Sequence, residues 1–131
     1  MEQNCCEALK LVKGLRKQIE KRNNAFISEL DDIATWANLG LYFADKLRGG
    51  VALATFSQSK QSNEKEKAVN YLEKCVGHWQ QVVRLTENRY VTMPYVSMGH
   101  HQQRWPEFTG FHWKHFLKDV KRDLEIARTA K

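Results

Sequence analysis

The sequence predicts an all-α protein, an antiparallel four-helix bundle with a long aromatic loop before its last helix. Three observations predict this fold. Four stretches repeat apolar residues at the three-to-four spacing of an amphipathic helix. Both prolines, Pro94 and Pro106, lie in the last third of the chain, so none interrupts the helices expected before them. No stretch has the alternation of a strand with a matching partner.

The first helix is expected over residues 4–22. Its apolar positions step by three, three and four residues, which places them on one helix face: Leu9, Val12, Leu15 and Ile19. Asn4 followed by Glu7 resembles an N-cap with its capping-box partner. The pair Asn23-Asn24 indicates the end of this helix and the start of the next.

The second helix is expected over residues 24–56. It keeps the helical period at Phe26, Ile27, Leu30, Ile33, Ala34, Ala37, Leu41, Ala44 and Leu47. Gly40 and the pair Gly49-Gly50 weaken this assignment, because each glycine costs a helix about 1 kcal/mol. Either the helix continues and the glycines admit a neighbouring backbone, or it ends or kinks near Gly49. Continuation is favoured because the residues after Gly50 remain mostly apolar.

A polar connection over residues 57–63 leads to the third helix, which is expected to run to about Tyr90. Ser62 or Asn63 is the predicted cap, with Glu64 in the acidic first turn. The apolar face of this helix comprises Ala68, Tyr71, Leu72, Cys75, Trp79, Val82 and Val83. The fourth helix is expected over residues 111–130, with Phe116, Val120, Leu124 and Ala127 at regular steps.

Residues 91–110 lack helical periodicity and are long for a loop in a compact domain. Aromatic residues gather in and beside this loop, among histidines and glutamines. They could plug the end of the bundle, since large aromatic side chains mostly serve burial. Alternatively, aromatic faces with polar neighbours suit stacking on sugar rings or bases. The candidate residues for contact with a ligand or another domain are Tyr95, His100, His101, Trp105 and Trp113.

The net charge of +6 permits binding to RNA or another polyanion. The basic residues cluster near both ends of the chain, where solvated helix faces are the simpler interpretation. An odd count of three cysteines excludes a closed disulfide framework, and Cys75 is expected to be a buried small apolar residue. The chain shows no run long enough to span a membrane and no recognisable signal peptide.

Metal chemistry has one weak indication. His112 and His115 are spaced to share a helix face, and His100 or His101 could complete a zinc site. The chain has no motif of a zinc or di-iron enzyme, so we expect neither a metal nor another cofactor. No nucleophile motif or phosphate-binding loop is present either.

Asp45 is a carboxylate beside an apolar row and therefore needs a partner. Lys46 and Arg48 are expected to lie too close in sequence to share its face. Arg84, Arg89 or His78 from the third helix could supply the partner. A structural ion pair between two helices is favoured over a catalytic acid.

Two stretches carry a resemblance to a known family. They are residues 36–48, WANLGLYFADKLR, and residues 68–79, AVNYLEKCVGHW, together with Phe111-His112-Trp113 and residues 119–123. Over residues 27–127 the chain resembles the helical C-terminal region attached to bacterial glycoside-hydrolase-like and carbohydrate-binding proteins, especially of the Bacteroidetes type. The resemblance implies an exported parent protein with its catalytic domain upstream and no catalytic residue in this chain. Gly49-Gly50 stands where that family suggests small residues such as alanine.

The sequence thus predicts one helical domain over residues 1–131 that is not an enzyme on its own. The favoured function is that of an accessory domain of a carbohydrate-active bacterial protein, with the upstream domain or a carbohydrate as partner. Its location would be the periplasm or cell surface if the parent is exported, and otherwise the cytoplasm. The alternatives are a free-standing basic bundle that binds RNA or a protein, and a small metal-dependent enzyme.

Overall fold

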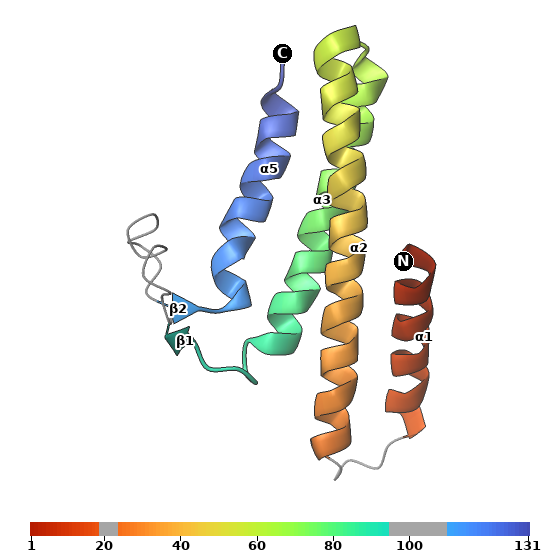
Figure 1. Cartoon of the computed structure of the whole chain (residues 1–131), viewed down its shortest axis with the longest axis vertical. Helices are drawn as coiled ribbons and strands as arrows, with labels where there is room; N and C mark the ends of the chain where they lie inside the picture. Colours follow the sequence, from red (N-terminus) through yellow and green to blue (C-terminus); the bar gives the residue numbers. More distant parts are fainter. Residues whose placement is uncertain (19–23, 95–109) are drawn as a thin grey trace.

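A computed structural model describes residues 1–18, 24–94 and 110–131 of the chain. The all-α class is confirmed (Figure 1). The helices are α1 (Glu2–Gln18), α2 (Asn24–Ser59), α3 (Ser62–Thr86) and α5 (Leu117–Thr129), the last preceded by the 3-10 turn η1 (Trp113–Phe116). Consecutive helices run in opposite directions, as the prediction of an antiparallel bundle requires.

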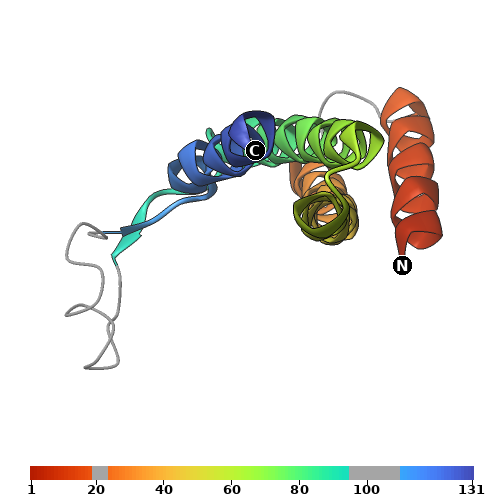
Figure 2. The ribbon, with the colours of Figure 1, turned by 90° about the horizontal axis from the view of Figure 1, so that it is seen from above.

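The bundle is open. α2 and α3 form its central pair, α1 packs against α2, and α5 packs against α3. From above, α1 and α5 lie at opposite edges (Figure 2). The larger core joins α2, α3 and α5 and includes Tyr42, Leu72, Trp79 and Leu124. A smaller core lies where α1 meets α2, around Val12 and Leu30.

α2 continues through all its glycines, as predicted. Gly40 admits α1, because a Cβ atom there would lie 2.5 Å from the Cys5 Sγ atom. Gly49 admits α3, because a Cβ atom there would lie 3.0 Å from the Leu72 Cγ atom. These two glycines lower helix propensity but allow two neighbouring helices to approach α2 closely.

The predicted N-caps are wrong. α1 begins at Glu2, and the Cys5 N–H donates to the Met1 carbonyl, so Asn4 lies inside the first turn. At α3 the N-cap is Gln61, whose side chain makes no capping bond. Lys60, with a φ of 57°, closes α2 by donating its N–H to the Phe56 carbonyl, and this places Ser62 in the first turn of α3. α3 ends at Thr86, short of the expected Tyr90.

Two short strands also depart from the prediction. β1 (Met93–Pro94) pairs antiparallel with β2 (Gly110–Phe111), and Met93 stands opposite Phe111. Gly110 is needed at this crossing, because a Cβ atom there would lie 2.6 Å from Thr92 Cγ2 and 3.0 Å from the Met93 carbonyl oxygen. The pairing brings the segment after α3 beside the segment that enters η1.

One face of α2 is apolar but uncovered. Its five large residues are between 45% and 69% exposed. We call this row the α2 stripe; it comprises Ile33, Trp36, Phe43, Leu47 and Val51. Ile33 and Leu47 match the helical period of the predicted core face, so their exposure corrects that expectation. No helix in the described ranges is long and apolar enough to cross a membrane.

Candidate functional site

A cleft of about 270 Å³ lies where α2 meets the segment after α3 and the segment that enters η1. Its walls are mostly apolar and aromatic, with three polar side chains among them. We call it the aromatic cleft; it is lined by Asp32, Thr35, Trp36, Tyr90, Val91, Met93, Phe111, His112 and Trp113. A mostly apolar hollow with a few convergent polar groups is the usual form of a small-ligand site.

Helix geometry and strand pairing assemble the cleft. Asp32, Thr35 and Trp36 are spaced by three and four residues, so they share one side of α2. The hydroxyl of Thr35 donates back to the Asp31 carbonyl at 2.8 Å. The opposite wall comes from Phe111 and the two residues that follow it, which the β1–β2 pairing holds beside Met93.

Tyr90 and Asp32 form a polar pair at the cleft. The Tyr90 hydroxyl donates to the Asp32 carboxylate. This hydrogen bond raises the pKa of Tyr90 above its ordinary value, because it favours the protonated phenol. The carboxylate keeps further acceptor capacity, which is available to a ligand hydroxyl or amine.

His112 is buried at the base of the cleft, with 2% of its surface exposed. Its Nδ1 atom accepts a hydrogen bond of 3.1 Å from the Lys114 N–H and caps η1. When Nδ1 accepts, a neutral imidazole carries its proton on Nε2. Within the described ranges Nε2 has no hydrogen-bond partner, which is unusual for a buried polar atom.

Trp113 faces both the cleft and the core. The Trp79 indole N–H donates to the Trp113 carbonyl at 3.0 Å, and the two rings meet edge to face at 6.1 Å. Phe111 and Phe116 extend this cluster, at 5.1 Å from Trp113 and 6.3 Å from Trp79 respectively. These ring contacts fit the interpretation in which the aromatic residues plug the end of the bundle. Part of Trp113 also lines the cleft.

Of the predicted contact residues, the structure therefore places Trp113 in the cleft. Tyr95, His100, His101 and Trp105 lie outside the described residues. Sequence reasoning missed the α2 wall of the cleft, Asp32, Thr35 and Trp36. One available signal was the spacing of Asp32 and Trp36, which sets a carboxylate one turn from an indole.

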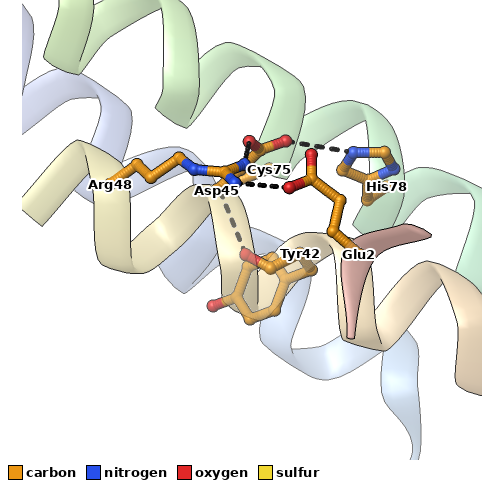
Figure 3. Close-up of polar contacts among 6 residues, drawn as sticks. All are labelled: Glu2, Tyr42, Asp45, Arg48, Cys75 and His78. Atoms are coloured by element: carbon orange, nitrogen blue, oxygen red, sulfur yellow. Dashed lines mark hydrogen bonds and ion pairs between the residues drawn. The ribbon is translucent and has the colours of Figure 1, made fainter. Parts of the chain in front are cut away.

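Asp45 is buried between helices and has partners from two of them (Figure 3). Its Oδ2 atom lies 3.3 Å from His78 Nε2 on α3, so His78 is the interhelix partner that the sequence suggested. Its Oδ1 atom lies 3.5 Å from Arg48 Nη1, which also pairs with Glu2 on α1. The expectation that Arg48 is too close in sequence is wrong, because residues three apart are neighbours on a helix.

The same region holds Cys75, whose Sγ lies 3.5 Å from the Tyr42 carbonyl oxygen (Figure 3). Burial raises the pKa of the Cys75 thiol to about 12. Cys75 is therefore a small core residue, as predicted, and not a reactive thiolate. Nearby, Lys46 donates to Asp123 on α5 and to the Tyr42 hydroxyl. These bonds outweigh the loss of hydration and raise the pKa of Lys46.

A second buried carboxylate, Asp31 on α2, joins α1 and the segment after α3 to its own helix. Arg16 from α1 and Arg89 from just beyond α3 both pair with it. Two cations compensate a charge whose burial alone would be costly. These pairs account for Asp31 and Asp45 as structural groups.

The metal hypothesis rested on four histidines, of which two are described. His112 and His115 have ring centroids 6.1 Å apart, and His115 Nδ1 lies 3.2 Å from the Gly110 carbonyl oxygen. The described part of the chain contains no group of three side chains placed to hold a metal ion. His100 and His101 lie outside it.

Comparison with known proteins gives no relative. No family model, no curated protein and no solved structure matches the chain. The resemblance to helical regions of carbohydrate-active proteins thus gains no support from these comparisons.

Proposed function

We propose that the chain is a non-catalytic helical accessory module that holds a sugar ring of a carbohydrate in the aromatic cleft. The observation that supports this function is the cleft itself, with four aromatic side chains around Asp32, Thr35 and His112. Aromatic walls stack on the apolar face of a sugar ring, and carboxylate and hydroxyl groups bind its hydroxyls. A volume of about 270 Å³ suits one ring rather than a long chain.

The parent protein in this proposal is carbohydrate-active, and its chemistry lies in another domain. The acids of the described chain support the non-catalytic role. Asp45 and Asp31 are engaged with cations that join helices. Glycoside hydrolysis needs two carboxyl groups facing each other across a bond, and among the described residues Asp32 is the one acid lining the cleft.

The alternative, a basic bundle that binds RNA, has less support. Exposed lysines of the N-terminal cluster lie on α1, and those of the C-terminal cluster lie on η1 and α5. These elements are at opposite edges of the molecule (Figure 2). A nucleic-acid site requires its cations along one surface.

The test is a titration with soluble mono- and oligosaccharides, followed through the indole N–H signals of Trp36 and Trp113 by NMR. Binding in the cleft shifts both signals in a saturable way. Tyr90→Ala removes one wall and is expected to weaken binding by roughly tenfold or more, since an aromatic contact contributes about 1 kcal/mol beyond its area. Ile126→Ala, on the exposed side of α5, is the matched control and keeps full affinity.

Two results would count against the proposal. One is the absence of any saturable shift across the sugar panel. The other is a shift that Tyr90→Ala and Asp32→Asn leave unchanged, because the sugar would then bind elsewhere.

A further inference from the structure

The α2 stripe is a row of exposed apolar side chains along α2, interrupted at Gly40, which Cys5 of α1 approaches. From Ile33 to Val51 its members are separated by three, seven, four and four residues, which keeps them on one side of the helix. The row holds no charged residue, and Ala54 continues it one turn beyond Val51. An apolar face of this length is typical of a helix that packs against another helix.

The row points away from α3 and lies next to the side of α2 that α1 contacts at Gly40. Gly49 faces α3, because a Cβ atom there would meet Leu72. Successive residues are about 100° apart around a helix, so Leu47 and Val51 project from nearly the opposite side. Figure 2 agrees, since α3 lies on one side of α2, α1 lies beside it, and the side of α2 away from α3 is uncovered.

The exposed area is large for a monomer. Side chains of this size, 45–69% exposed, leave roughly 600 Å² of apolar surface on one chain, at the upper end of what soluble monomers carry. If two copies bury this row against each other, about 1,200 Å² is removed from water, which reaches the range of standard stable interfaces. Leu11 and Leu15 of α1 are also exposed and could extend the contact.

We infer that the α2 stripe docks a second copy of this chain, with the two α2 helices antiparallel about a two-fold axis. A two-fold contact uses the same patch twice, so one self-complementary row supplies both sides. In an antiparallel pair, Phe43 of each copy packs against Leu47 of the other. Trp36 of each copy then lies beside Gly50 and Ala54 of the other.

The space at Gly50 fits this arrangement. Nothing lies within 4 Å of the position that a Cβ atom would take there, so the backbone is open to an incoming side chain. Trp36 is the largest and one of the most exposed members of the row. Antiparallel docking thus sets the largest side chain against the smallest residues at both ends of the contact, as interdigitating cores do. Trp36 also lines the aromatic cleft, so the two contacts share this side chain, whereas Phe43, Leu47 and Val51 lie outside the cleft.

The test is the mass of the purified chain in solution, measured by light scattering after size exclusion at micromolar concentration. A dimer has about 31 kDa, twice the 15.3 kDa of one chain. Leu47→Glu places a charge in the middle of the contact and is expected to shift the mass to that of the monomer. Ile126→Glu changes an apolar residue on α5 that is 52% exposed, against 69% for Leu47, and is expected to leave the dimer intact.

Circular dichroism is used to check that each variant keeps its helices. If Leu47→Glu fails to fold, Phe43→Ser takes its place. A wild-type chain that is monomeric throughout this range would overturn the inference. Dimers that persist in both stripe variants would do the same.

A spin-label distance tests the orientation. With Cys5 and Cys6 replaced by Ser, a nitroxide at Gln58 reports the separation of the two α2 ends. Antiparallel docking predicts roughly 40 Å at 1.5 Å rise per residue. A separation near the helix–helix spacing of about 10 Å would instead show parallel docking and overturn the proposed arrangement.

Discussion

His78 Nε2 lies 3.3 Å from Asp45 Oδ2, and this contact joins α3 to α2 across the core. Asp45 is 6% exposed, whereas the His78 side chain is 24% exposed. The two partners therefore differ in what each leaves behind when the other is removed. A buried carboxylate without its partner is costly, while a half-buried imidazole can reach water.

This asymmetry predicts that His78→Ala destabilises the protein more than Asp45→Asn. His78→Ala leaves the buried carboxylate with the 3.5 Å contact to Arg48 as its one remaining ion pair in the described part of the chain, and we expect a loss of about 2–3 kcal/mol. Asp45→Asn removes the charge and keeps an amide that can still bond, for a loss of about 1 kcal/mol. Urea unfolding of both variants measures the difference. Equal losses would show that Asp45 does not depend on His78.

Asp31 leads to a prediction about non-additivity. Arg16 and Arg89 reach this buried carboxylate from different elements, so either one alone can compensate the charge. Each single change to Ala is expected to cost about 1 kcal/mol, but the double variant more than the sum, because it strands the charge. A double-mutant cycle with urea unfolding tests this. The cycle repeated with Asp31→Asn is the control and should be additive.

The sequence predicts the helices of this fold well because the apolar spacing is local. It predicts the uncovered face of α2 poorly because α2 is apolar on several sides. Ile33 and Leu47 match the period as well as Leu30 and Leu41 do, and only the positions of α1 and α3 decide which of them are buried.

The aromatic cleft was predictable only in part, for a similar reason. Trp113 is predicted as a contact residue because aromatic residues are dense in its part of the sequence. Asp32 and Trp36 come from a helix about eighty residues away in sequence, and the β1–β2 crossing that joins them to Phe111 rests on only two residues in each strand. His112 caps η1 through a local backbone turn, and the sequence carries no periodic pattern from which such a turn could be predicted.

Gly40 predicts a paired effect at the α1–α2 contact. A Cβ atom at Gly40 would lie 2.5 Å from the Cys5 Sγ atom, so in Gly40→Ala the Cys5 side chain must turn away, and we expect a cost of about 1 kcal/mol. Cys5→Ala in the same chain removes the sulfur and should recover most of the loss.

Gly77→Ala is the matched control. Its Cβ meets nothing within 4 Å, so the gain in helix propensity should stabilise α3 by up to about 1 kcal/mol. Thermal unfolding measures all three changes. A Gly40→Ala variant as stable as Gly77→Ala would contradict the close contact.

Cys75 predicts a loss of stability at alkaline pH. Burial raises the pKa of its thiol from 9.0 to about 12 in the folded chain. A group whose pKa is higher in the folded state stabilises the fold fully below its unfolded pKa, and this contribution disappears as the pH rises through the folded pKa. Between pH 9 and 12 the free energy of unfolding should therefore fall, with a slope from this thiol approaching about 1.4 kcal/mol per pH unit.

Tyrosines and lysines titrate over the same range, so the informative quantity is the difference in the free energy of unfolding between wild type and Cys75→Ala. The variant is less stable at pH 7, because it lacks the buried sulfur, and the gap should narrow steadily as the pH rises. A gap that stays constant to pH 11 would mean that Cys75 ionises as readily in the folded chain as in the unfolded one.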